Sequence, residues 1–152
     1  KLVTALLSAL AAALALFAAS CGDTTEATTS SSTENGTSGS IVFTGLLDYP
    51  MTFTALDMDY MYWVTITADD PTLGPTEFEG VPLSEIFAYV GVHSDATTVV
   101  ITAADGSTSE VTLAGVSRDA LLAVGGDDAL STVMPGMASS AWVKDVVRME
   151  FK

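Results

Sequence analysis

The composition of the chain changes abruptly at Ile41, and this boundary limits what the chain can fold into. Before it, Asp23–Ser40 contains 11 Ser or Thr among 18 residues, three acidic residues and no large apolar side chain. Such a segment cannot bury enough apolar surface to offset the entropy lost on ordering, so we expect it to be disordered. After it, 112 residues alternate apolar and polar side chains. That length is enough for one compact domain and too short for two.

The first residues of the chain are strongly apolar. Lys1 is followed by Leu2–Phe17, in which 14 of 16 side chains are apolar, and then by Ala18, Ala19 and Ser20. A basic start, an apolar core and small residues before a break are typical of a secretory signal. A transmembrane anchor is the alternative, since about 18 apolar residues can just span a bilayer. The run is rich in Ala and no basic cluster follows it, so we expect a signal peptide over residues 1–20.

Cys21 is the only cysteine, which excludes a disulfide scaffold. The sequence Ala18-Ala19-Ser20-Cys21-Gly22 resembles the lipobox of bacterial lipoproteins. The resemblance implies cleavage before Cys21, a lipid on its thiol, and a lipid-anchored protein on the extracytoplasmic face of the cell membrane. Residues 21–40 would then be the tether of a domain over residues 41–152. An ordinary cleaved signal would instead leave a free thiol in an oxidising compartment.

The charge of the chain is strongly negative. It has 19 acidic residues against five basic ones, and its net charge is −14. A surface of this sign repels phosphate backbones, so we expect no nucleic-acid partner. It also disfavours electrostatic docking onto anionic lipid headgroups.

Pro82–Val90 has the clearest helical pattern. Apolar side chains recur at i, i+3, i+4 and i+7 from Leu83 and form one stripe along a helix. Pro82 suits the first helical position, and Gly91 suits the left-handed residue that ends a helix.

The rest of the domain shows short strand patterns separated by turns. Ala55–Met61 is expected to form one or two helical turns with Thr54 as the N-cap, and Asp105-Gly106 indicates a tight hairpin. Asp69–Pro75, with two prolines and a glycine, is expected to end the strand before it. We expect Glu77–Glu79 to lie at a sheet edge and Ala120–Val124 to form either a strand or a helical turn. The expected strands, these two included, are Ile41–Leu46, Met51–Thr54, Trp63–Ala68, Glu77–Glu79, Thr97–Ala103, Thr108–Leu113, Ala120–Val124, Leu130–Met134 and Val146–Phe151. The pattern predicts an α+β fold with mostly short strands in a mixed sheet and one main amphipathic helix.

Few residues suggest chemistry by themselves. His93 is the only histidine and follows the predicted helix, which favours a surface loop over a catalytic role. Two pairs of methionines are spaced three residues apart, Met58 with Met61 and Met134 with Met137. Their thioethers could bind Cu(I), although such methionines more often fill a core. The acidic residues Asp57, Asp59, Asp69 and Asp70 lack the spacing of a calcium loop, which favours a solvated face.

The domain resembles the oxidoreductase molybdopterin-binding domain of the sulfite oxidase type. The segments that carry the resemblance are Phe43–Leu46 through Pro50–Thr54, Phe78–Ile86 with Gly91-Val92, Val99–Gly106, Val133–Gly136, Trp142–Lys144 and Arg148–Phe151. The resemblance implies an α+β molybdopterin-binding-like fold over nearly all of the 112 residues. It also implies that the turn after Trp63–Ala68 and the loop Met134–Ala141 face the cofactor.

The sequence departs from that family where catalytic members hold their metal. Those members carry a molybdenum-ligating cysteine soon after the strand that corresponds to Trp63–Ala68, and this chain has Thr67-Ala68-Asp69-Asp70. An arginine is common where this chain has Ser131-Thr132. The basic residues of the domain are Arg118, Lys144, Arg148 and Lys152.

These departures favour a non-catalytic role, either binding of a small ligand or service as an accessory module to a redox partner protein. Asp69, Trp142 and Lys144 are the candidate ligand-binding residues, because Trp142 can stack on a flat anionic ligand and Lys144 can pair with it. The alternative is an oxidoreductase component that binds molybdopterin together with a partner. A copper-binding lipoprotein based on the methionines is a third hypothesis.

Overall fold

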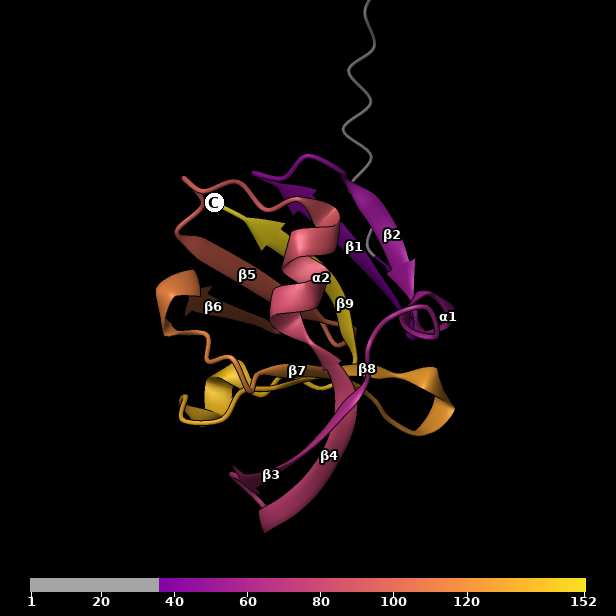
Figure 1. Ribbon diagram of the computed structural model, residues 1–152, viewed down its shortest axis with the longest axis vertical. Helices are drawn as coiled ribbons and strands as arrows, with labels where there is room; N and C mark the ends of the chain where they lie inside the picture. The colour runs from indigo at the N-terminus through magenta and orange to yellow at the C-terminus, as the bar shows by residue number, and fades with distance from the viewer. Residues whose placement is uncertain (1–35) are drawn as a thin grey trace, which may run out of the picture. The chain divides into compact units, whose positions relative to one another are not determined.

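The computed structural model describes residues 36–152. The expected signal peptide, Cys21 and most of the expected tether lie outside these residues. The described residues form two β-sheets, one two-turn helix and several single turns of helix (Figure 1). The strands are β1 Ser40–Gly45, β2 Met51–Thr54, β3 Val64–Asp70, β4 Gly74–Pro82, β5 Thr98–Ala103, β6 Thr108–Thr112, β7 Leu121–Val124, β8 Leu130–Val133 and β9 Val146–Phe151. The predicted α+β class is confirmed.

The larger sheet has five strands in the order β2-β1-β9-β5-β6. It is mixed, because β1 and β9 pair in parallel while its other neighbours are antiparallel. Alternate residues of the central strands are buried, such as Ile41 and Phe43 in β1 and Val99 and Ile101 in β5. Since alternate residues of a strand share a face, these side chains all point from one face of the sheet into the main core.

The helix α2, Leu83–Val90, covers that face (Figure 1). Leu83, Ile86 and Val90 are fully buried. The ring of Phe87 packs edge-on against that of Phe151 in β9, with centroids 5.2 Å apart. The predicted helix and its left-handed end at Gly91 are confirmed, although Pro82 is the N-cap of the helix and not its first residue.

The second sheet is antiparallel, with four strands in the order β3-β4-β7-β8. One of its faces completes the main core through Val81 and Leu122. The other carries a second apolar cluster built on Ala68, Leu121 and Val133. The β3–β4 hairpin extends away from α2 and the larger sheet (Figure 1). This sheet therefore presents a separate apolar surface beside a projecting hairpin.

The prediction of a short edge strand at Glu77–Glu79 is wrong. β4 runs for nine residues, Gly74–Pro82, and lies between β3 and β7. Pro75 is tolerated because β7 pairs only with Gly80–Pro82, so β4 has a single neighbour where the proline N–H is missing. The predicted end of the preceding strand is also corrected, since β3 continues through Asp70.

The smaller elements follow the sequence closely. The hairpin at Asp105-Gly106 joins β5 to β6, and Ala120–Val124 yields the strand β7. Helix α1, Ala55–Met58, begins after the N-cap Thr54. The folded part begins before Ile41, because Ser40 opens β1 and the Ser38 hydroxyl donates a 2.8 Å hydrogen bond to Asp145. Over residues 36–152, no helix is long and apolar enough to cross a membrane.

Candidate functional site

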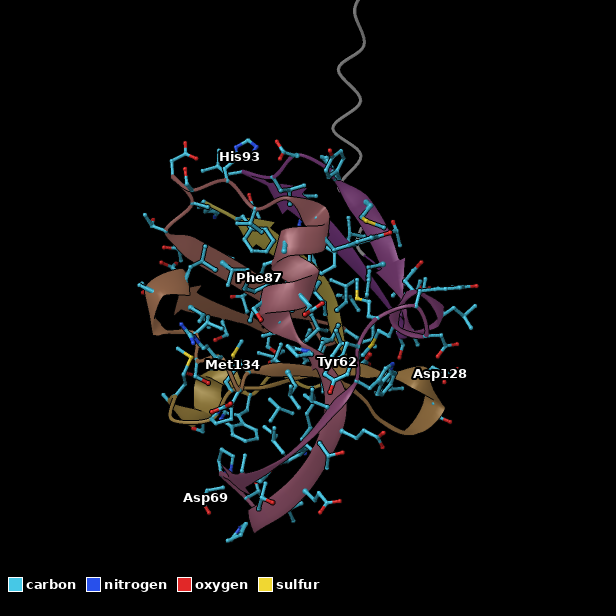
Figure 2. The ribbon with its side chains drawn as sticks, viewed as in Figure 1. Tyr62, Asp69, Phe87, His93, Asp128 and Met134 are labelled. Atoms are coloured by element: carbon cyan, nitrogen blue, oxygen red, sulfur yellow. The ribbon has the colours of Figure 1, made fainter. Side chains whose placement is uncertain are left out.

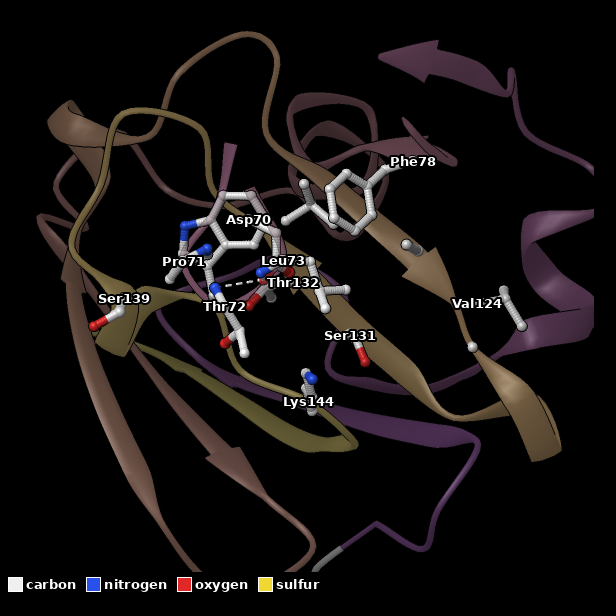
Figure 3. A pocket seen from close by; sticks show the side chains of 14 residues that line it. Asp70, Pro71, Thr72, Leu73, Phe78, Val124, Ser131, Thr132, Ser139 and Lys144 are labelled. Carbon is white, nitrogen blue, oxygen red and sulfur yellow. Dashed lines mark hydrogen bonds between the residues drawn. The ribbon is translucent and has the colours of Figure 1, made fainter. Parts of the chain in front are cut away.

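A cavity of about 370 Å³ lies where the β3–β4 hairpin meets β7, β8 and the loop that leads to β9 (Figure 3). The cavity lies beside the second apolar cluster, at the base of the projecting β3–β4 hairpin. The residues that line it are Asp70, Pro71, Thr72, Leu73, Phe78, Ala123, Val124, Gly125, Ser131, Thr132, Val133, Ser139, Trp142 and Lys144. Two of the three predicted ligand-binding residues, Trp142 and Lys144, are among them.

Aromatic side chains form one wall of the cavity. The rings of Phe78 and Trp142 pack edge-on, with centroids 5.6 Å apart and planes inclined by 61°. Both are half-buried and extend the cluster of Ala68, Leu121 and Val133. Their remaining exposed surface faces an open hollow, where a flat ligand can pack against it.

The cavity also holds one acidic and one basic side chain. Asp70 Oδ1 accepts hydrogen bonds from the backbone N–H groups of Thr72, at 2.7 Å, and Leu73, at 2.9 Å. The first of these is drawn in Figure 3. These two bonds hold the pKa of Asp70 below its ordinary value, and the attraction of Lys144 contributes less. Asp70 is thus engaged by its own turn, and within the described residues Lys144 forms no salt bridge with it.

Asp69 does not share the site with Trp142 and Lys144, which corrects the sequence-based expectation. β3 continues through Asp70, and successive residues of a strand point to opposite faces. Asp70 therefore faces the cavity, and Asp69 is exposed on the other face beside its partner Pro75. Asp70 lines the cavity in place of Asp69 because β3 runs two residues further than the sequence pattern predicts.

Thr132 positions the loop that carries Trp142 and Lys144. It is only 2% exposed, and its Oγ1 donates to the carbonyl of Ala141 at 2.8 Å and accepts from the N–H of Val143 at 2.9 Å. Its own N–H donates to the carbonyl of Val143 at 2.9 Å. This role could not be predicted from the sequence, because a threonine in a strand gives no signal that its hydroxyl is buried.

The other candidate residues lie apart from the cavity. His93 is exposed on the loop after α2, as predicted, and its Nε2 lies 3.0 Å from Asp48 Oδ1. Met58 and Met134 are fully buried in the main core, which confirms the core prediction for Met58. In residues 36–152, no three His, Cys, Asp or Glu side chains come together as metal ligands.

Molybdopterin, which the resemblance implies, does not fit the residues that line the cavity. Catalytic members of that family hold the metal with a thiolate, and the only cysteine of the sequence is Cys21. The cofactor also carries a phosphate, which proteins bind through several charged donors. Within the described residues Lys144 is the one basic side chain that lines the cavity, and a single ammonium does not supply several charged donors. No reaction through this cofactor follows from these residues.

Comparisons with known proteins bear on the fold. No family model and no curated protein matches the sequence. Among solved structures, the chain is similar to the sulfane dehydrogenase SoxCD from Paracoccus pantotrophus, with a TM-score of 0.64 and 22% sequence identity. The domain therefore shares its fold with the matched part of that enzyme, in agreement with the predicted α+β class. The match covers 74% of this chain and 37% of that chain, and at this identity it shows the fold alone.

Proposed function

We propose that this protein is a lipoprotein on the extracytoplasmic face of the cell membrane, anchored by a lipid on Cys21. Its molybdopterin-binding-like domain is a non-catalytic module that binds a small ligand in the cavity of Trp142 and Lys144. The segment between Cys21 and the folded domain is the tether that holds the domain near the membrane surface. There it presents the bound ligand, or the domain itself, to a redox partner protein.

The composition of the cavity carries the proposal for binding. An apolar wall of Phe78 and Trp142 faces a hollow with one basic side chain, Lys144. Asp70 is engaged by the N–H groups of its own turn, which leaves the Lys144 ammonium to attract a ligand. Aromatic stacking together with one positive charge suits a flat ligand with a single anionic group.

The binding proposal is tested with 2-naphthoate, a flat aromatic monoanion, titrated into the full chain in a non-ionic detergent. Lys144→Ala should weaken binding about two- to fivefold, as expected for loss of a charge contact at an exposed position. Lys152→Ala is the matched control, because Lys152 is also exposed, lies near Glu150 and does not line the cavity. Equal affinities for the two variants would overturn the assignment of Lys144.

The non-catalytic role is tested on full-length protein recovered from its native membrane. Elemental analysis for molybdenum, tungsten and copper, with pterin fluorescence after oxidation, should find neither the metals nor pterin. Stoichiometric molybdenum with pterin would overturn the proposal and make the protein an oxidoreductase component that binds the cofactor with a partner.

Anchoring is tested separately by metabolic labelling with an alkyne fatty acid and by membrane fractionation. The Cys21→Ser variant should lose the label and leave the membrane fraction. A second variant that combines Cys21→Ser with Ser32→Cys keeps one thiol outside the lipobox and should also stay unlabelled. A label that follows the thiol to residue 32 would contradict lipidation by the lipobox.

A further inference from the structure

A second pocket, of about 410 Å³, lies between α1, the turn that follows it and α2. It is lined by Asp57, Tyr60, Met61, Glu85 and Tyr89, so it shares no residue with the cavity of Trp142 and Lys144. Two tyrosine rings, a thioether and two carboxylates thus border one hollow. Neither the fold nor the proposed ligand of the first cavity explains this combination.

Both tyrosine rings at the pocket are exposed to solvent, and other contacts hold the segments that carry them in place. Tyr60 is 92% exposed and Tyr89 is 53% exposed, which is high for large aromatic side chains. The ring of Tyr89 packs edge-on against the buried Phe53, with centroids 6.4 Å apart. Trp63 Nε1 donates to the carbonyl of Met58 at 2.8 Å and so ties down the turn that carries Tyr60. The faces of the two rings are therefore accessible to a ligand, while the segments that carry them are fixed by packing and hydrogen bonding.

The acidic side chains give the pocket its charge. Glu85 lies four residues before Tyr89 on α2, so the two side chains are neighbours on one side of the helix. Asp57 Oδ2 accepts hydrogen bonds from the N–H and the hydroxyl of Thr54, both at 2.7 Å, which fixes its carboxylate. None of the basic residues between positions 36 and 152 lines this pocket. Its field is therefore negative without local compensation.

We propose that this pocket binds a small organic cation that carries an alkylated ammonium group, such as choline. The faces of tyrosine rings attract such cations, and carboxylates nearby add to the attraction. The methyl groups of the ligand pack against Tyr60, Met61 and Tyr89, while its charge lies near Asp57 and Glu85. A quaternary ammonium has no N–H group to satisfy, so an aromatic and thioether lining costs it no hydrogen bond.

The choice of ligand separates this proposal from simple apolar binding. Choline, its neutral isostere 3,3-dimethyl-1-butanol and glycine betaine are titrated into the full chain in a non-ionic detergent, with binding followed by calorimetry. Choline should bind saturably, and the neutral isostere at least about tenfold more weakly. Betaine should also bind more weakly than choline, because its carboxylate is repelled by Asp57 and Glu85. Equal affinity for choline and the isostere, or no saturable choline binding, would overturn the proposal.

Variants locate the site. Tyr60→Leu should weaken choline binding about two- to fivefold, the loss expected for one exposed cation–π contact, and Tyr60→Phe should retain it. Tyr62→Leu is the matched control. Tyr62, labelled in Figure 2, is 71% exposed on the same connection between α1 and β3 and does not line the pocket. An equal loss in the two leucine variants would contradict the site. Lys144→Ala should leave choline binding unchanged, so failure here and failure of the first cavity are distinguishable.

Discussion

The hydroxyl of Thr132 and the backbone of Val143 are joined by a buried hydrogen bond of 2.9 Å between β8 and the loop before β9. The N–H of Thr132 also donates to the carbonyl of Val143 at 2.9 Å. This connection holds the segment that carries Trp142 and Lys144 against the second sheet. The position of the cavity wall therefore depends on a residue that itself offers a ligand little exposed surface.

Thr132→Val tests that dependence. The change keeps the shape of the side chain but leaves the N–H of Val143 and the carbonyl of Ala141 without their hydroxyl partner. We expect a loss of about 1–3 kcal/mol in the free energy of unfolding and weaker binding of 2-naphthoate. Thr132→Ser keeps the hydroxyl and should retain most of the affinity. Denaturant unfolding and calorimetry measure the two effects, and unchanged binding in Thr132→Val would show that the loop is held by other contacts.

Asp70 should remain ionised at a lower pH than an ordinary aspartate. Hydrogen bonds from Thr72 and Leu73 lower its pKa, and Lys144 lowers it further. Because the folded pKa is depressed, the stabilisation from Asp70 is fully present above the unfolded value of about 3.9 and is lost as pH falls through the folded pKa. Carboxyl-carbon NMR on the full chain should therefore show a depressed pKa for Asp70, and the β3–β4 turn should loosen as the pH falls through that pKa.

The cause of that shift can be separated with Lys144→Met. The variant removes the smaller, coulombic cause and keeps both backbone hydrogen bonds, so the pKa of Asp70 should rise only part of the way to its ordinary value. A complete return to the ordinary value would show that Lys144, and not the turn, controls the charge of Asp70.

Gly45 and Gly106 form a matched pair for testing close backbone packing. Both have a positive φ, of 95° and 84°. A Cβ atom at Gly45 would overlap the carbonyl oxygen of Phe151, whereas one at Gly106 would meet nothing within 4 Å. We expect Gly106→Ala to cost about 1–2 kcal/mol through backbone strain alone, and Gly45→Ala to cost about 1–3 kcal/mol more through steric overlap. Equal shifts in the urea midpoint would mean that β1 and β9 can separate slightly at little cost.

Met58 and Met134 should have no part in metal binding. Both thioethers are fully buried in the core. Met58→Leu and Met134→Leu are volume-conserving, so each should cost less than about 1.5 kcal/mol of stability. A Cu(I) titration should give the same curve for both variants as for the unchanged protein. Loss of a stoichiometric copper site in either variant would show that the substituted methionine binds copper.

The sequence predicts elements well where the signal is local. The helix at Leu83–Val90 comes from a stripe of apolar residues, and the β5–β6 hairpin comes from Asp105-Gly106. The length of β4 was missed because Gly74, Pro75, Gly80 and Pro82 all indicate breaks. Whether a proline interrupts a strand depends on which neighbour needs its N–H, and that is a property of the assembled sheet.

The candidate site could be predicted only in part for a related reason. Trp142 and Lys144 line the same cavity, and their closeness in sequence is the signal that groups them. The choice between Asp69 and Asp70 required the register of β3, and a shift of one residue moves a side chain to the opposite face. Phe78 and Thr132 join the site through pairings between strands that are distant in sequence. No spacing in the chain encodes those pairings.

The parallel pairing of β1 with β9 places the first strand of the domain beside the last, and β9 then lies between β1 and β5. Without residues 146–151, no strand would join the β1–β2 hairpin to the β5–β6 hairpin in the larger sheet. Contacts between such distant parts of a chain form slowly. The larger sheet therefore cannot close before β9 has been made, and under the export proposed above a chain that is still unfolded is the form that a translocation channel threads. The strand order that closes the domain also delays its closure until the whole domain has been made.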